Sequence, residues 1–186
     1  MMVIRDFAER CRQGMAELGL SLASHREIIE GRALALRTVG PHIATADTLS
    51  DVQDYTAASS FVFKGSAGDM AGVLAVIPLN PLAAGGLAAG VFDGVRPPKS
   101  QIARPGDPVI AIYGWGMAGA TWRGRGVVMG AAIALHRDLF PELPLYGRAA
   151  TPGGERTLLK RMGAEPLSGP GGLVLAPPWN LERAAA

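Results

Sequence analysis

The chain has 186 residues, a length that suits a single domain with a buried core. Apolar residues make up 48% of it and charged residues 18%, which excludes a disordered polar chain and favours a compact α/β protein. The formal net charge of +2 is too small to argue for nucleic-acid binding, so we expect no nucleic-acid partner.

Helices are predicted for much of residues 1–58. Apolar residues recur at helical spacing over residues 3–18. Ser24 followed by Glu27 forms a capping box, which predicts a second helix over residues 25–39. We expect these helices to pack on a sheet as surface helices. The alternative is that their outer faces form a dimer interface or an acceptor-binding surface.

A third helical signal and a β-hairpin follow in the sequence. Ser50 with Gln53 repeats the capping pattern and predicts a short helix. Residues 61–63 and 72–77 are rich in strand-forming residues, and the polar, glycine-containing stretch between them predicts a hairpin. Residues 81–92 are rich in alanine and glycine, and they fit either a loose helix or irregular structure.

The second half of the chain alternates strands with helices after a proline-rich surface loop at residues 94–108. This alternation implies some parallel strand pairing. We therefore predict one α/β domain over residues 1–186, with a mixed sheet in residues 59–176 and helices on both sides of it. The predicted order is strand 109–121, helix 127–140, strand 145–150, helix 154–162 and strand 173–175.

The stretch between Asp69 and Asp93 carries no charge and is long enough to span a bilayer. Pro78, Asn80 and several glycines interrupt it, so a strand, a turn and a buried segment explain it better than a membrane span. We expect no membrane partner, and membrane association stays as the less favoured alternative.

Cysteine and histidine content argue against a metal site and against disulfides. The single cysteine, Cys11, lies in a predicted helix, which leaves no disulfide framework. His25, His42 and His136 are scattered along the chain, so we expect no metal. Charges from Arg5 onward interrupt any early apolar run, so we expect no secretory signal and a cytoplasmic protein.

Residues 121–129 are the most informative part of the chain, because they connect a predicted strand to a predicted helix. Gly124 and Gly126 let the backbone approach a ligand closely, and Arg123 and Arg125 add positive charge. The start of the helix offers unpaired N–H groups and the positive end of a dipole, which together favour phosphate. The sequence therefore predicts a phosphorylated cofactor here.

Residues 118–126, followed by a helix, resemble the acyl-CoA-binding motif of the GNAT superfamily of N-acyltransferases. That motif reads Arg or Gln, two residues, Gly, one residue, then Gly or Ala. Residues 146–164 resemble the next strand and helix of the family, and the likeness covers residues 109–176. The resemblance implies a splayed sheet with a V-shaped opening between its two central parallel strands.

The resemblance also implies how acetyl-CoA, or a longer acyl-CoA, is held. Pantetheine inserts in the opening and bonds to the backbone of the first central strand, while the pyrophosphate lies over the amides that follow. Residues 70–92 are uncharged and rich in glycine and alanine, and such a segment could accommodate an acyl chain longer than acetyl. The cofactor-binding residues implied are Gly116, Met117, Ala118, Arg123, Gly124, Arg125, Gly126, Val127, Val128 and Met129.

Four positions depart from the pattern of the family. Val128 replaces the last Gly or Ala of the motif, which narrows the pyrophosphate cradle or shifts the backbone. Leu159 stands where many members have a tyrosine that protonates the leaving thiolate. Thr151-Pro152 replaces a common asparagine, and Tyr146 stands where a glutamate is often found. The cofactor half of the site is retained, whereas the usual acid/base half is missing.

Tyr146 and Tyr113, one on each central strand, are the candidate catalytic residues, because each could hydrogen-bond a thiolate or an acceptor. The alternative is that both are core tyrosines with a hydroxyl at the rim. Trp115 and Trp122 are expected to straddle the cleft, either in core packing or as a pocket lining. His136, late in a helix, is expected to be a surface or dipole-stabilised histidine.

The first hypothesis for function is an acyl-CoA-dependent N-acyltransferase, most simply one that acetylates a primary amine by direct attack. The amine would arrive neutral, and backbone N–H groups would polarise the thioester carbonyl. The alternative is a non-catalytic CoA-binding or protein-interaction module, because the acid/base residues are missing. The acceptor stays open, as does a homodimer, which is common in the families that this chain resembles.

Overall fold

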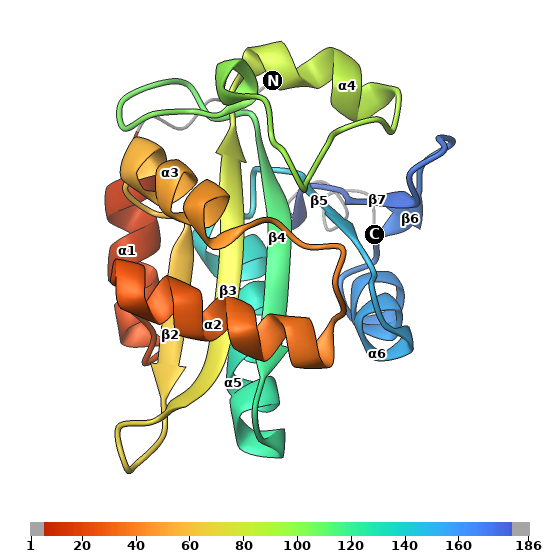
Figure 1. Cartoon of the computed structure of the whole chain (residues 1–186). Coiled ribbons are helices and arrows are strands. Elements are labelled where there is room, and N and C mark those ends of the chain that lie inside the picture. The colour runs from red at the N-terminus through yellow and green to blue at the C-terminus, as the bar shows by residue number, and fades with distance from the viewer. Residues whose placement is uncertain (1–5, 180–186) are drawn as a thin grey trace.

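The computed structural model describes residues 6–179, and within them seven strands form one mixed sheet. Its order is β1-β2-β3-β4-β5-β7-β6, in which only β4 and β5 run parallel (Figure 1). The mixed sheet predicted from the sequence is confirmed. The strands are β1 (Ser21–Leu22), β2 (Ser60–Lys64), β3 (Met70–Leu79), β4 (Ala111–Gly119), β5 (Leu145–Arg148), β6 (Glu165–Pro166) and β7 (Leu173–Ala176).

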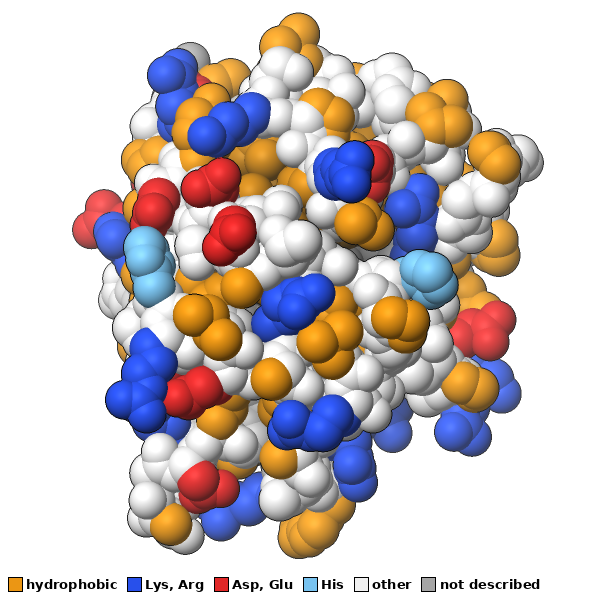
Figure 2. Space-filling model, in the orientation of Figure 1, with side chains coloured by type: hydrophobic (Ala, Val, Ile, Leu, Met, Phe, Trp, Pro, Cys, Tyr) orange, Lys and Arg blue, Asp and Glu red, His pale blue; other side chains and the backbone are white. Residues whose placement is uncertain are grey.

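Helices cover both faces of the sheet, as Figure 1 shows. Helices α2 and α3 lie on one face, here called the α2 face, and α5 crosses behind β3 and β4 on the other, the α5 face. On the α2 face, basic, acidic and apolar side chains are interspersed (Figure 2). The helices are α1 (Phe7–Glu17), α2 (His25–Thr38), α3 (Ala46–Thr56), α4 (Ala84–Ala88), α5 (Trp122–Ala134) and α6 (Pro152–Arg156). One π-helical segment extends α5 and another extends α6, at Leu135–Leu139 and Thr157–Arg161.

Two helix starts differ from the prediction. Helix α3 is capped by Thr45, whose hydroxyl accepts from the amide of Thr48 at 3.1 Å, so Ser50 lies inside the helix and caps nothing. Helix α5 begins at Trp122 rather than at Val127. The stretch predicted as a turn is thus the first part of a helix, because the hydroxyl group that caps it lies earlier in the chain.

The uncharged segment at residues 70–92 is not a membrane helix. It contains strand β3, a 3₁₀ turn at Pro81–Ala83 and the short helix α4. Asn80 sets the turn, since its side-chain oxygen accepts from the amide of Leu82 at 2.9 Å. Among residues 6–179, no helix is long and apolar enough to cross a membrane.

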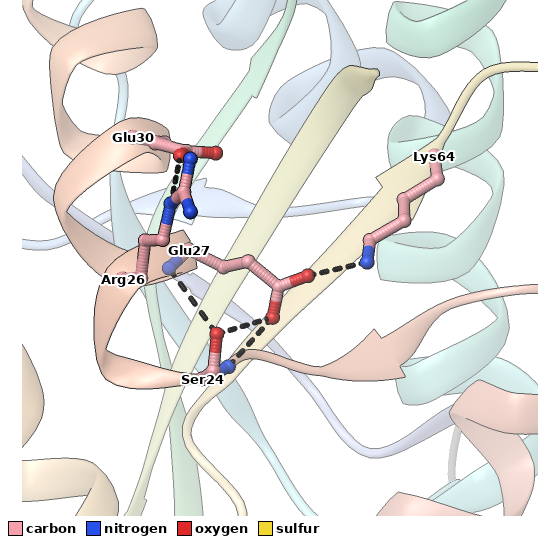
Figure 3. A network of polar contacts seen from close by, with 5 residues as sticks. All are labelled: Ser24, Arg26, Glu27, Glu30 and Lys64. Atoms are coloured by element: carbon pink, nitrogen blue, oxygen red, sulfur yellow. Dashed lines mark hydrogen bonds and ion pairs between the residues drawn. The ribbon is translucent and has the colours of Figure 1, made fainter. Parts of the chain in front are cut away.

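Helix α2 is tied to the sheet at its first turn by polar contacts (Figure 3). The carboxylate of Glu27 accepts from the Ser24 amide at 2.8 Å, which completes the predicted capping box. Its other oxygen pairs with Lys64 of β2 at 2.6 Å. These bonds, with the Lys64 contact the largest, lower the pKa of Glu27 to about 2.

We expect Glu27→Ala to lower the free energy of unfolding at neutral pH by about 1 kcal/mol, because it removes the carboxylate that bonds to the Ser24 amide and pairs with Lys64. Glu30→Ala is the matched control, since Glu30 pairs only with Arg26 on the helix surface, and its effect should stay below about 0.5 kcal/mol. The pKa of Glu27 is lowered, so its stabilisation is present above the ordinary carboxyl pKa and is lost as the pH falls towards 2. Urea unfolding of both variants from pH 7 to pH 3 measures this, and equal losses for both would contradict it.

Candidate functional site

The two parallel strands separate after a short region of pairing. Strand β4 continues to Gly119, whereas β5 ends at Arg148, and the next residues turn into α6. The second half of β4 therefore has no partner strand on the β5 side. The pairing that exists joins Ile112 to Leu145, Tyr113 to Tyr146 and Gly114 to Gly147.

A β-bulge lies where the separation begins. Gly114 is opposite Val76 and Gly116 is opposite Ala75, so Trp115 is the extra residue on β4. A bulge bends its strand, and this one comes directly after Gly114, the last residue of β4 that pairs with β5.

The hydrogen-bond pattern of β4 shows which main-chain groups face the opening. The amide of Ala120 donates to the carbonyl of Ala71 on β3 at 2.9 Å. Since alternate residues of a strand bond to opposite sides, Ala118 and Gly116 also bond towards β3. The N–H and C=O groups of Met117 and Gly119 point into the opening. Of Gly116, Met117 and Ala118, which the sequence predicted, Met117 alone offers its backbone there, and Gly119 is an additional position that the sequence did not predict.

A cleft of about 530 Å³ occupies the opening and extends between α5 and α6. Arg125, Val128 and Met129 line it from α5, and Gly154 and Thr157 line it from the last helix. On the α2 face it is lined by the end of α2 and the loop after it, including Val39 and His42. The cleft thus passes through the sheet from one face to the other.

A second, smaller cavity of about 90 Å³ adjoins the cleft on the α2 face. The two share Trp115, Gly116 and Met117 of β4 in their walls. Side chains of α2, among them Ile28 and Ala35, close the far side of the cavity. A group that entered the cleft beside Gly116 would have apolar space beyond it.

The glycines at the start of α5 have different surroundings. A Cβ atom on Gly124 would lie 1.9 Å from the carbonyl oxygen of Ala71, so this glycine lets α5 pack directly on β3. A Cβ atom on Gly126 would meet nothing within 4 Å. Gly126 therefore leaves open space, whereas the space around Gly124 is filled by the protein itself.

Few of the amides predicted to hold pyrophosphate are free. The amide of Gly124 donates to Thr121 Oγ1 at 3.0 Å, and that of Arg125 to the Thr121 carbonyl at 2.9 Å. The amides of residues 126–129 belong to the hydrogen-bond ladder of α5. Helix geometry leaves the amides of Trp122 and Arg123 without an intrahelical acceptor, so they are the donors available to an anion.

The predicted arginines lie differently with respect to the cleft. Arg125 lines it, whereas Arg123 is exposed and is not part of its wall. Arg148, which the sequence argument did not select, is a second arginine in the wall. Among residues 6–179, no aspartate or glutamate lines the cleft, so its charged side chains are cationic.

The two candidate tyrosines are also separated by the fold. Tyr113 is 4% exposed and lines the cleft, whereas Tyr146 packs at the edge of the core on the α2 face and is not in the wall. Burial raises the pKa of both phenols, and the charge of Arg148 opposes the rise at Tyr113. Tyr113 therefore stays protonated at neutral pH and can donate a hydrogen bond, but it cannot act as a base.

Four other residues singled out in the sequence are now placed. Trp115 is in the wall of the cleft and its indole N–H donates to the Gly94 carbonyl, whereas Trp122 is 81% exposed outside it. His136 is buried, contrary to the expected surface position, and burial lowers its pKa. Cys11 is buried in the core, where burial raises its pKa to about 12, so it is no nucleophile.

The fold is similar to that of a solved structure from Corynebacterium glutamicum ATCC 13032, described as histone acetyltransferase HPA2 and related acetyltransferase. The similarity covers 86% of this chain and 96% of that chain, with a TM-score of 0.48 and 20% sequence identity. No family model matches the sequence, and no curated protein matches it.

Proposed function

We propose that this chain is an acyl-CoA-dependent N-acyltransferase of the GNAT type, which transfers an acetyl group from acetyl-CoA to a primary amine. The observation that carries the proposal is the opening between β4 and β5, where Met117 and Gly119 present main-chain groups with no partner strand. Pantetheine contains amide groups, which can bond to these positions as a neighbouring strand would.

The start of α5 suits the phosphate end of the cofactor. The free amides of Trp122 and Arg123 and the positive end of the helix dipole favour a diphosphate, and Arg125 adds a cation at the wall of the cleft. The pantetheine opening and this helix start are adjacent, because Gly119 and Trp122 are separated by only a tight connection. One extended ligand can therefore contact both.

In the proposed reaction, the amine attacks the thioester directly, without a covalent enzyme intermediate. The lone pair of the neutral amine attacks the thioester carbonyl carbon, the new C–N bond forms, and the C–S bond breaks. The proton lost by the amine nitrogen ends on the sulfur of CoA. Backbone N–H groups beside the bulge stabilise the developing oxyanion, and holding amine and thioester in one cleft supplies the orientation. Tyr113 lines the cleft, and its protonated hydroxyl would donate a hydrogen bond to the thiolate or the acceptor in this reaction.

The second candidate function is a non-catalytic CoA-binding module. The absence of any carboxylate among the described residues that line the cleft favours it, because no general base is supplied there. The smaller cavity beside Gly116 also affects which acyl-CoA is the donor, because it offers room for an acyl chain longer than acetyl.

Calorimetric titration with acetyl-CoA, followed by a turnover assay on a panel of amines, tests the proposal. We expect a dissociation constant in the micromolar range, and release of free CoA thiol together with an N-acetylated product. The same two measurements with butyryl-CoA in place of acetyl-CoA test whether the site accepts a longer acyl chain. Binding with no turnover of any amine would favour the non-catalytic module, and absence of binding would overturn both.

A further inference from the structure

Arg148 occupies a particular place in the cleft. It is the last residue of β5, where the two parallel strands separate. Side chains alternate along a strand, so Arg148 lies on the same face as Tyr146, the α2 face. Its guanidinium lies beside Tyr113 and against the backbone of Gly171, where a Cβ atom would be 2.4 Å from Nη2. Arg148 is thus held in the wall of the cleft rather than extended into solvent.

Arg148 and Asp93 both act on the phenol of Tyr113, but no carboxylate among residues 6–179 forms an ion pair with Arg148. Within the same part of the chain, no carboxylate lines the cleft beside Arg148. Its Nε atom is buried and has no hydrogen-bond partner. A buried donor without an acceptor is costly, and a cation in partly desolvated surroundings is stabilised by an anion that fills the site.

Arg148 and the proposed phosphate site approach the cleft from different faces of the sheet. The start of α5 and Arg125 approach the cleft from the α5 side, where Val128 packs in the core of that face. Arg148 lies on the opposite face, where Tyr113 is beside it and Trp115 belongs to the same wall of the cleft. With the cofactor bound as proposed, that face is the one left open for the acceptor.

We propose that Arg148 binds a carboxylate of the acceptor, so that the acceptor class is amino acids and other primary amines that carry a carboxylate. This inference rests on the proposed function. The planar guanidinium matches a carboxylate through two parallel N–H···O bonds. Arg148 forms and breaks no covalent bond in the reaction. It orients the acceptor so that the amine nitrogen reaches the carbonyl carbon, while the C–N and C–S bonds change as described above.

Matched pairs of acceptors test the inference. Glycine, alanine, leucine and phenylalanine are each compared with their carboxamides, which keep the amine and lose the charge. The readouts are CoA thiol release and the mass of the N-acetylated product. We expect kcat/KM to be at least tenfold higher for the best acid than for its carboxamide. Arg148→Gln should abolish this preference while the acetyl-CoA dissociation constant changes less than threefold.

Two further variants keep the test decisive. Arg148→Lys retains the charge without the planar guanidinium, so it should keep part of the preference for acids over carboxamides. If Arg148→Gln does not fold, Arg148→Lys takes its place in the test. Arg137→Gln is the matched control, because Arg137 is exposed and paired with Asp138, and it should leave the preference unchanged.

Three results would overturn the inference. Equal use of acids and carboxamides by the unmodified chain would do so, as would a preference that survives in Arg148→Gln. Binding of acetyl-CoA with no acetylation of any acid in the panel would also overturn it, while the cofactor site would stand. Failure to bind acetyl-CoA at all would instead overturn the proposed function on which the inference rests.

Discussion

Replacing Gly116 by phenylalanine should weaken acetyl-CoA binding on the order of 100-fold, which corresponds to roughly 2.7 kcal/mol. A Cβ atom at Gly116 meets nothing within 4 Å, and this residue lines both the cleft and the smaller cavity. The first atom of the new side chain would therefore meet open space, and the ring would extend into the space proposed for pantetheine or the acyl group. Calorimetric titration of the variant with acetyl-CoA measures the loss.

The control for this substitution is Gly130→Phe. Gly130 lies on α5, is exposed, has nothing within 4 Å of its Cβ position and is not in the wall of the cleft. It should bind acetyl-CoA as the unmodified chain does, and thermal melting of both variants should show that the fold is kept. Undiminished binding by a folded Gly116→Phe protein would place the cofactor elsewhere and would reject the proposed function.

The second large effect is expected at two glycines that stand two residues apart. Gly124→Ala should lower the free energy of unfolding by about 3 kcal/mol, because its Cβ would lie 1.9 Å from the Ala71 carbonyl oxygen and would force α5 away from β3. Gly126→Ala should instead raise it by about 0.5 to 1 kcal/mol, because alanine favours a helix and the space around it is open. Urea unfolding followed by circular dichroism measures both.

Opposite signs for the two substitutions are the expected outcome. Similar losses at both positions would mean that Gly126 also packs against the protein, in contradiction to the geometry of α5. No loss at Gly124 would mean that α5 can move away from Ala71 at little cost.

Local signals in the sequence predicted the elements well where the interacting groups are close in the chain. The capping box of Ser24 and Glu27 marked the start of α2, and the polar stretch between two strand-forming runs marked the hairpin of β2 and β3. The capping pattern at Ser50 was a wrong signal, because Thr45 caps that helix first. Several residues near a helix start can act as the N-cap, so the sequence predicts the first residue of a helix only to within a few positions.

The candidate site was predicted in part. The strand, glycine and arginine pattern pointed to the region where β4 enters α5, and the structure places a cleft there. The pattern did not distinguish Gly124 from Gly126, because only the contact with Ala71 on another strand separates them. Arg148 was not selected either, since an arginine at the end of a short strand has no local signature.

By itself, the sequence determined most of the element types and the alternation of strands and helices that predicts a parallel pair, whereas it placed the start of α5 five residues too late. Hydrophobic periodicity, helix caps and glycine turns depend on residues close together in the chain, so each can be recognised from a single segment of the sequence. Only the tertiary structure decided that β4 and β5 pair briefly and then separate, that Tyr113 faces the cleft while Tyr146 does not, and that Arg148 stands there with a buried Nε atom that has no hydrogen-bond partner. Those features depend on strand register and on contacts between distant segments, and neither is encoded in any local pattern.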